Sequence, residues 1–169
     1  ECIGKKGIGH FVLISKKNHT MMKVKANDEF IFHNINAFEK DNSVFIDSVY
    51  YPDLEMLNSN LNTETITKQL LKRCIINTAD LTSTIKQHID NPAELGCINP
   101  DFYGNENRYI WIATNSIDNT DRIGFLHLNC ITKIDLLNKE TITYSNNSNT
   151  FVGEPIFIPK NEKEDDGWI

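Results

Sequence analysis

The side chains best suited to chemistry in this sequence are one histidine and two glutamates that occupy comparable places. His33, Glu94 and Glu154 each lie in or at the start of a short β-rich run that follows a hairpin pattern. If these runs are equivalent strands of a repeated fold, the three side chains converge near one axis. A histidine that converges with carboxylates is typical of a metal site or an acid–base site.

Each of these side chains also has a simpler interpretation. A single histidine within an apolar strand is more often a hydrogen-bonded core residue than a metal ligand. Glu154 precedes Pro155 and the apolar run 156–158. A carboxylate at the edge of a buried strand must be paired, and a structural salt bridge would achieve that as well. Spacing alone therefore leaves both interpretations open.

The sequence repeats the elements that could bring these side chains together. Three hairpin patterns rich in β-branched residues are each followed by two more β-rich runs. The unit therefore has four strands and recurs about every 60 residues. The hairpins are expected at residues 11–25, 71–88 and 130–144, and the pairs of runs that follow them at 30–33 and 44–47, 94–98 and 108–112, and 154–158 and 167–169.

Such a repeat predicts an all-β fold made of four-stranded antiparallel sheets. A single meander cannot bury both faces, and radial stacking of several gives a β-propeller. About three blades are predicted and a ring needs at least four, so we expect an internal piece of a longer protein. A β-sandwich is the rival fold, and the repeated strand order favours the propeller. Residues 53–70 are expected to form an inserted loop with a short helix, and residues 145–150 a surface loop.

Composition narrows the class of protein further. The net charge is −6 and the basic residues are scattered, which excludes a nucleic-acid-binding surface. No apolar run approaches the roughly 20 residues that a membrane-spanning helix needs. The wide cysteine spacing fits neither paired metal ligands nor a disulfide scaffold, so reduced cysteines and a cytoplasmic location are expected. The cysteines are Cys2, Cys74, Cys97 and Cys130.

Four motifs, in matching order and spacing, resemble those of the carotenoid cleavage oxygenases, the family that includes proteins like the retinal pigment epithelium membrane protein. The similarity covers nearly the whole chain, so residues 1–169 are expected to be part of one carotenoid oxygenase β-propeller domain. Gly96 and Cys97 depart from the family pattern, which usually has proline and then arginine or glutamine. The motifs are FHxxNAxE at residues 32–39, ExPxINP at 94–100 followed by Arg108-Tyr109, EPxFVP at 154–159 and EDDGW at 164–168.

The resemblance implies a seven-bladed propeller with one iron(II) on its axis, held by four histidines. By match, His33 is the third of these ligands, and the other three lie outside this sequence. The resemblance places Glu154 behind the ligands, where it would accept the other ring N–H of a ligating histidine, with His33 the expected partner. Such a carboxylate fixes the tautomer of a metal-bound histidine. The histidines that match no ligand position are His10, His19, His88 and His127.

The remaining motif residues are interpreted as structural. Asn36 and Glu39 are expected to hold the turn after the strand of His33. Trp168 is expected to lie in the core. A tight turn between the last two strands of a blade is expected at Asp165, Asp166 and Gly167.

The function implied by the resemblance is iron-dependent cleavage of a conjugated double bond in a carotenoid or apocarotenoid by O₂, giving two carbonyl products. Within the family, a stilbene-cleaving dioxygenase or a retinoid isomerohydrolase is equally compatible with these residues. The alternative to an enzyme is a degenerate propeller without catalytic activity. The fragment alone is expected to bind iron weakly and to be inactive. Substrate would arrive from a membrane surface through an apolar patch that no segment of this sequence shows.

Overall fold

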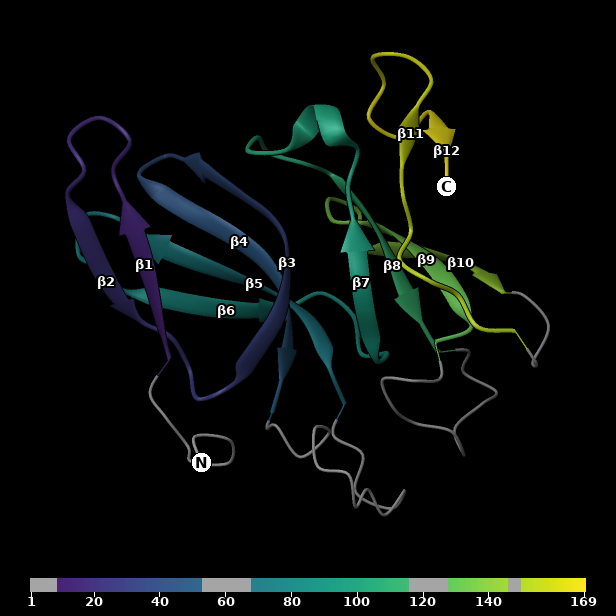
Figure 1. The fold of residues 1–169 in the computed structure, drawn as a ribbon, viewed down its shortest axis with the longest axis horizontal. Coiled ribbons are helices and arrows are strands. Elements are labelled where there is room, and N and C mark those ends of the chain that lie inside the picture. Colours follow the sequence, from purple (N-terminus) through teal and green to yellow (C-terminus); the bar gives the residue numbers. More distant parts are fainter. Residues whose placement is uncertain (1–8, 53–67, 116–127, 146–149) are drawn as a thin grey trace.

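The computed structural model describes residues 9–52, 68–115, 128–145 and 150–169, and within them it shows four antiparallel sheets in succession along the chain (Figure 1). A hairpin of β1 and β2 comes first, two four-stranded sheets follow, and a short pair of strands comes last. The strands are β1 His10–Ile14, β2 Met21–Lys25, β3 Phe30–Lys40, β4 Ser43–Tyr51, β5 Leu70–Asn77, β6 Ser83–Gln87, β7 Ala93–Cys97, β8 Tyr109–Thr114, β9 Cys130–Asp135, β10 Glu140–Ser145, β11 Ile158–Pro159 and β12 Gly167–Trp168, and a 3-10 turn η3 spans Pro100–Phe102.

The two four-stranded sheets have the same topology. Their strand orders are β3-β4-β5-β6 and β7-β8-β9-β10, so each strand pairs with the one before it, and β3 and β7 lie at sheet edges. The second strands, β4 and β8, are the most buried because they have a neighbouring strand on each side and a packed sheet over their faces. The first strands of the two sheets, β3 and β7, therefore occupy equivalent positions, and both carry candidate site residues.

The hairpins at the ends of these sheets share one turn. A residue that ends a strand accepts a backbone hydrogen bond from the residue four places later, which has a positive φ. The first residue also accepts a backbone N–H through its side-chain oxygen, which fixes the chain reversal without a glycine. The turn residues are Ser15 and His19, Asn77 and Leu81, and Asp135 and Lys139. The repeat read from the sequence is thus a physical repeat of turn geometry.

Apolar side chains fill the space between each sheet and the next. Each fully buried aliphatic side chain contributes about 1.5–3 kcal/mol to stability by leaving water. Three apolar layers, one between each pair of successive sheets, therefore hold the four sheets together. The layer between β1–β2 and β3–β6 contains Val24, Ile46, Cys74 and Ile76. The layer between the two four-stranded sheets contains Ile35, Val49, Tyr51, Leu71, Ala93, Ile98, Ile110, Ile112 and Ile134. The layer toward β11–β12 contains Cys97, Trp111 and Phe157.

The predicted fold class is confirmed, and the predicted strands correspond closely to those observed. The β-sandwich alternative is wrong, because the four sheets pack in series rather than as one face-to-face pair. The predicted phase of the repeat is also wrong. Each hairpin ends a sheet and the two runs after it begin the next one, because periodicity gives the spacing of repeats but not the boundary between them. Most of the predicted inserted loop, residues 53–67, and most of the predicted surface loop, residues 146–149, lie outside the described residues.

The sequence also predicts that no helix crosses a membrane and that the cysteines are reduced. Among the residues that the structure describes, no helix combines the length and apolar character needed to cross a bilayer. Cys74, Cys97 and Cys130 are buried and free, while Cys2 lies outside the described ranges. Burial raises the pKa of the Cys74 and Cys97 thiols to about 11, so both stay protonated and pack as small apolar groups.

Candidate functional site

His33 lies on β3, where the strand departs from regular pairing. The register with β4 shifts between Ile31 and Asn34 and again between Asn34 and Asn36. Each shift adds one residue to β3, and such bulges re-aim side chains next to functional sites. His33 has no paired residue on β4, and its side chain is 47% exposed. The bulges therefore leave the imidazole free of the regular alternation of side chains along the strand.

Glu94 lies on β7, the corresponding strand of the next sheet. β7 has its own register shift between Glu94 and Cys97, and Leu95 adopts a φ of 55°. At Gly96, a Cβ atom would lie 2.5 Å from Cδ1 of Ile35 on β3. The glycine that departs from the family pattern therefore allows close approach of β7 to β3.

The two side chains meet across the junction between the sheets. His33 Nδ1 lies 2.7 Å from Glu94 Oε2, and Glu94 is completely buried. The hydroxyl of Tyr51 donates to Glu94 Oε1 at 2.7 Å, and the backbone N–H of Leu95 donates to Oε2 at 2.6 Å. Burial, and next the hydrogen bond to Glu94, raise the pKa of Tyr51, so its hydroxyl keeps its proton. The carboxylate is thus an acceptor of three hydrogen bonds.

This arrangement determines which ring nitrogen of His33 can act as a ligand. A carboxylate only accepts, so the bond to Glu94 places the proton on Nδ1 and leaves the lone pair on Nε2. Histidines that bind metals in proteins are usually held in this way, with the second nitrogen donating to a carboxylate. The chemistry of this pair therefore fits a metal. Among the described residues, no group of three or more histidine, cysteine or acidic side chains is placed to hold a metal ion, so they contain no complete metal site.

The expected pairing of His33 with Glu154 is wrong, because the nitrogen that Glu154 was to bind is occupied by Glu94. Glu154 is exposed and precedes β11, and its charge adds to the effect of burial in raising the pKa of Cys97 on β7. The periodic pattern had included Glu94 among the converging side chains. It did not reveal which carboxylate would reach the histidine, because that depends on the bulge in β7.

Asn36 and Glu39 do not hold the turn after β3, contrary to expectation. That turn is made by Asp41 and Asn42, both with positive φ. Asn36 is buried and bonds to the loop between β7 and β8 in the neighbouring sheet. Glu39 lies on the exposed side of β3, where it pairs with Val44 of β4.

The EDDGW segment forms the connection between β11 and β12 and also binds the neighbouring sheet. Asp166 closes the turn through backbone bonds with Lys160 and Lys163, as expected of a turn residue. Asp165 instead bonds to Lys133 on β9 at 2.8 Å. Gly167 begins β12, where a Cβ atom would lie 2.6 Å from the ring of Phe157. By analogy with the complete sheets, β11 and β12 are first strands of a blade rather than last ones.

Glu164 and Trp168 lie at the two ends of this segment. Glu164 Oε1 accepts the backbone N–H groups of Arg108 and Tyr109 at 2.6 and 2.8 Å, which fastens the turn to the start of β8. Trp168 is 67% exposed, so the expectation that it lies in the core is wrong for the described residues.

The ring of Phe32 lies next to His33 and contacts two further aromatic rings. The ring of Phe32 contacts Phe30 edge-on at 4.6 Å and Tyr51 edge-on at 5.4 Å, and its centroid lies 6.3 Å from that of His33. Phe30 and Phe32 are each more than one third exposed. The candidate ligand therefore stands beside an accessible apolar surface.

A second histidine–carboxylate pair, which the sequence did not reveal, lies within the sheet β3–β6. Asp47 on β4 is buried and receives two bonds from Arg73 on β5, at 2.8 and 2.7 Å, and a third from His88 Nε2 at 3.2 Å. Arg73 also lies over the rings of Phe38 and Phe45. His10 and His19 are exposed, and His127 lies outside the described residues.

Antiparallel four-stranded sheets in series, with a histidine and its carboxylate on facing first strands, define part of a β-propeller. Comparison with known families supports this class. The family model of the retinal pigment epithelial membrane protein, RPE65, matches residues 6–169. The chain belongs to this family, the carotenoid cleavage oxygenases.

Individual relatives agree with that assignment. The chain is 26% identical over 167 residues to an apocarotenoid-15,15'-oxygenase of Synechocystis sp., an alignment that covers 94% of this chain and 33% of the relative. It is 28% identical over 181 residues to a carotenoid isomerooxygenase of Galleria mellonella, covering 95% and 33%. It is 34% identical over 85 residues to the chloroplastic carotenoid cleavage dioxygenase 7 of Arabidopsis thaliana, covering 47% and 14%. The chain thus spans about one third of the first two relatives.

Solved structures show the same fold. The cobalt-substituted Synechocystis apocarotenoid oxygenase superposes with a TM-score of 0.83 at 25% identity, covering 94% of this chain and 34% of that one. A chimera of that oxygenase with RPE65 superposes with a TM-score of 0.82 at 24% identity and the same coverage. The fold of the described residues is therefore that of a propeller enzyme, over about one third of its length.

Proposed function

We propose that the whole protein is an iron(II)-dependent dioxygenase that cleaves a conjugated double bond of a carotenoid or apocarotenoid to give two carbonyl products. The observation that carries the proposal is the His33–Glu94 pair, at 2.7 Å across two sheets, in a chain of the carotenoid cleavage oxygenase family. A propeller without activity has no use for a buried carboxylate that orients an exposed imidazole.

His33 would supply one ligand of the iron through Nε2, and the other ligands would come from parts of the protein outside this chain. Glu94 holds the proton on Nδ1 and keeps the ring in one orientation. We assign Glu154 the same kind of role toward a ligand histidine carried elsewhere in the ring. When bound, iron(II) supplies the redox chemistry with O₂ that the cleavage of a carbon–carbon double bond requires. The isolated chain, with only one of the expected histidine ligands, would bind iron weakly and lack activity.

The surroundings of His33 suit an apolar substrate. Phe30 and Phe32 present aromatic surface beside the imidazole, and no charged side chain takes part in the described contacts of these rings. A polyene can lie against such rings without loss of hydrogen bonds to water. The printed names of the relatives, which include an apocarotenoid oxygenase and a carotenoid cleavage dioxygenase, support the same substrate class. We place the protein in the cytoplasm, in contact with the membrane surface where such substrates dissolve.

A second candidate is double-bond isomerisation at the same site. It is favoured by the name of one relative, a carotenoid isomerooxygenase. Both candidates use the same histidine and differ in the product. The products therefore decide between them.

The test is expression of the whole protein in carotenoid-accumulating cells, followed by mass analysis of the products under air and under ¹⁸O₂. The proposal predicts aldehydes or ketones that carry oxygen from O₂, and their loss in His33→Ala. Glu39→Gln serves as the control, since Glu39 lies exposed on the same strand. Geometric isomers without cleavage would favour the second candidate. Unchanged carotenoids with iron-loaded protein would contradict both for this substrate class.

A further inference from the structure

The bond between His33 and Glu94 depends on how two sheets are held together, because each residue belongs to a different one. Any freedom between β3 and β7 would separate imidazole and carboxylate. Side-chain bonds that cross this junction are therefore candidates for controlling the site. Among the described residues, Tyr51 bonds directly to Glu94, and Lys40 forms an exposed ion pair with Glu106. Asn36 makes the remaining set of bonds and, unlike Lys40, is buried.

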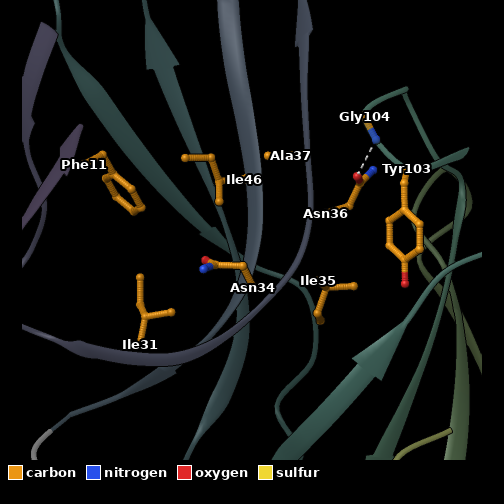
Figure 2. A pocket seen from close by; sticks show the side chains of 9 residues that line it. All are labelled: Phe11, Ile31, Asn34, Ile35, Asn36, Ala37, Ile46, Tyr103 and Gly104. Atoms are coloured by element: carbon orange, nitrogen blue, oxygen red, sulfur yellow. Dashed lines mark hydrogen bonds between the residues drawn. The ribbon is translucent and has the colours of Figure 1, made fainter. Parts of the chain in front are cut away.

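Asn36 uses both ends of its amide. Its Nδ2 donates to the backbone oxygen of Asn105 at 2.9 Å and to Oδ1 of Asn107 at 2.8 Å. Its Oδ1 accepts the backbone N–H of Gly104 at 3.1 Å, the bond drawn in Figure 2. Asn36 is 5% exposed and Asn107 is 3% exposed. Three bonds from one buried side chain thus connect the strand of His33 to the loop between β7 and β8.

The loop is shaped to receive this amide. Gly104 has a φ of +80°, a conformation that favours glycine. Its backbone N–H donates to Oδ1 of Asn36 from this conformation. Asn107 in turn donates to the backbone oxygen of Tyr109 at 3.2 Å, which fixes its own amide with Oδ1 toward Asn36. An aspartate at position 36 would set a carboxylate oxygen against two acceptor oxygens. Only a residue with donor and acceptor ends fits this place.

The position of Asn36 along β3 links it to the candidate ligand. It follows the second register shift, and His33 lies within the first one, so the two share the irregular part of the strand. This part has fewer regular ladder bonds to hold it in place. A groove of about 580 Å³ lies along β3, and Figure 2 shows Phe11 and Ile46 on one side of the strand and Asn36, Tyr103 and Gly104 on the other. The loop bonds of Asn36 therefore restrain β3 where pairing to β4 is weakest.

We propose that Asn36 is a positioning residue, which fastens β3 to the β7–β8 loop and so holds His33 Nδ1 on Glu94 with Nε2 presented outward. As far as it concerns metal binding, the inference rests on the proposed function. Asn36 touches neither His33 nor any reacting atom in the described contacts. It acts through the relative placement of the two strands.

The other end of the same loop provides a matched control. Asn99 is 1% exposed, donates to the backbone oxygen of Glu164 at 3.1 Å and accepts the backbone N–H of Asp101 at 3.0 Å. It is also a buried asparagine with its amide used at both ends. Its bonds, however, join the loop to the β11–β12 connection and not to β3. Loss of Asn99 should loosen the loop without loosening His33.

The experiment uses the whole protein as wild type, Asn36→Ala, Asn36→Asp, Gly104→Ala and Asn99→Ala. The first readout is the ring-nitrogen chemical shifts of ¹⁵N-labelled histidine in the metal-free protein, with His33 assigned by His33→Gln. The wild type is expected to show a single Nδ1–H form of His33, and the Asn36 variants a mixture of forms. Gly104→Ala disturbs the same contact through the loop and should also give a mixture of forms. It therefore tests the inference even if a variant at position 36 fails to fold.

The second readout is the affinity for Co²⁺, followed by visible absorption. Asn36→Ala and Asn36→Asp should weaken Co²⁺ binding about tenfold, as expected for loss of support behind a ligand, while Asn99→Ala should stay within about twofold. If Asn36 acts through Glu94, the double variant Asn36→Ala with Glu94→Gln should bind no more weakly than Glu94→Gln alone. Additive losses would instead indicate a general structural role and overturn the inference.

The two readouts separate the failures. A wild type that binds no Co²⁺ through His33, but whose His33 nitrogen shifts respond to Asn36→Ala, would refute the metal site and keep the positioning role. Nitrogen shifts of His33 that are identical in wild type and Asn36 variants would overturn the positioning role. Equal losses in Asn36→Ala and Asn99→Ala would overturn it as well.

Discussion

Two histidine–carboxylate pairs lie near each other in this chain and are built in opposite ways. In one, Asp47 is buried between Arg73 and His88, and all three side chains are at most 16% exposed. In the other, Glu94 is buried without an arginine or lysine among its described partners, and its histidine, His33, is 47% exposed. His88 uses Nε2 for its carboxylate, and His33 uses Nδ1.

The difference separates a structural pair from one that can serve chemistry. Arg73 compensates the charge of Asp47, so the cluster is complete within its own sheet and can do little beyond holding β4 to β5. Glu94 is satisfied by neutral donors and by His33, whose side chain is partly exposed. A histidine bonded to a carboxylate does not by itself show whether the pair is structural or functional. The burial of the ring and the identity of the third partner decide what the pair can do.

The largest effect on stability is expected at Asp47. Asp47→Asn removes the charge that compensates buried Arg73, which should lower the free energy of unfolding by about 3–5 kcal/mol. Urea unfolding of the whole protein, followed by tryptophan fluorescence, measures this change. Asp165→Asn is the matched control, because the Lys133–Asp165 pair is partly exposed and should cost less than about 1 kcal/mol. Equal losses of unfolding free energy in the two variants would show that the buried Asp47 pair is worth no more than the exposed Asp165 pair.

Acid should remove part of the same contribution. Burial opposes ionisation of Asp47, but the bonds from Arg73 and His88 outweigh it and lower its pKa. A carboxylate with a lowered folded pKa stabilises the fold above the unfolded value of about 3.9, and loses that contribution as the pH falls through the folded value. The difference in unfolding free energy between wild type and Asp47→Asn should therefore be constant near pH 6 and shrink below about pH 4. A difference that grows on acidification would contradict this sign.

A smaller effect, on metal binding rather than on stability, is expected at Glu94. Glu94→Gln keeps the shape of the side chain but removes the charge behind His33, which should weaken iron or Co²⁺ binding about 10–100-fold. Titration of the metal-free whole protein with Co²⁺ gives the affinity. Glu39→Gln, an exposed glutamate on the strand of His33, should leave it unchanged. Comparable weakening at Glu39 would show that Glu94 has no special relation to the ligand.

The smallest effect is expected at Tyr51. Tyr51→Phe leaves Glu94 Oε1 without its hydroxyl donor but keeps the aromatic contact with Phe32, so metal binding should weaken by about 1 kcal/mol, or about fivefold. The same Co²⁺ titration measures it, with Tyr144→Phe on the exposed face of β10 as control. An effect as large as that of Glu94→Gln would mean that Tyr51 does more than hold the carboxylate.

The strands could be predicted from the sequence because they obey local rules. Period-two burial in β1 and β9, and turn residues at fixed spacing such as Ser15 and His19, are both visible in one dimension. The family motifs supplied the candidate ligand His33. The phase of the blades was missed, since a repeat has no marked beginning.

The partner of His33 and the role of Asn36 were missed for a different reason. Both are set by bulges, which shift the register of β3 and β7 by one residue at a time and exchange the side chains that face the junction. The repeat had grouped Glu94 with His33, and Gly96, which lies against Ile35, marks the close approach of the two strands. Asp47, Arg73 and His88 left no signal, because they come from two strands and from the residue after a third, with ordinary spacing.

The central claim is that His33 binds the metal while His88, also bonded to a carboxylate, does not. Its most direct test is the iron content of the purified whole protein as wild type, His33→Ala and His88→Ala. The account predicts stoichiometric iron in the wild type and in folded His88→Ala, and no retained iron in His33→Ala. Iron that persists in His33→Ala, or that is lost equally from both variants while they remain folded, would contradict it.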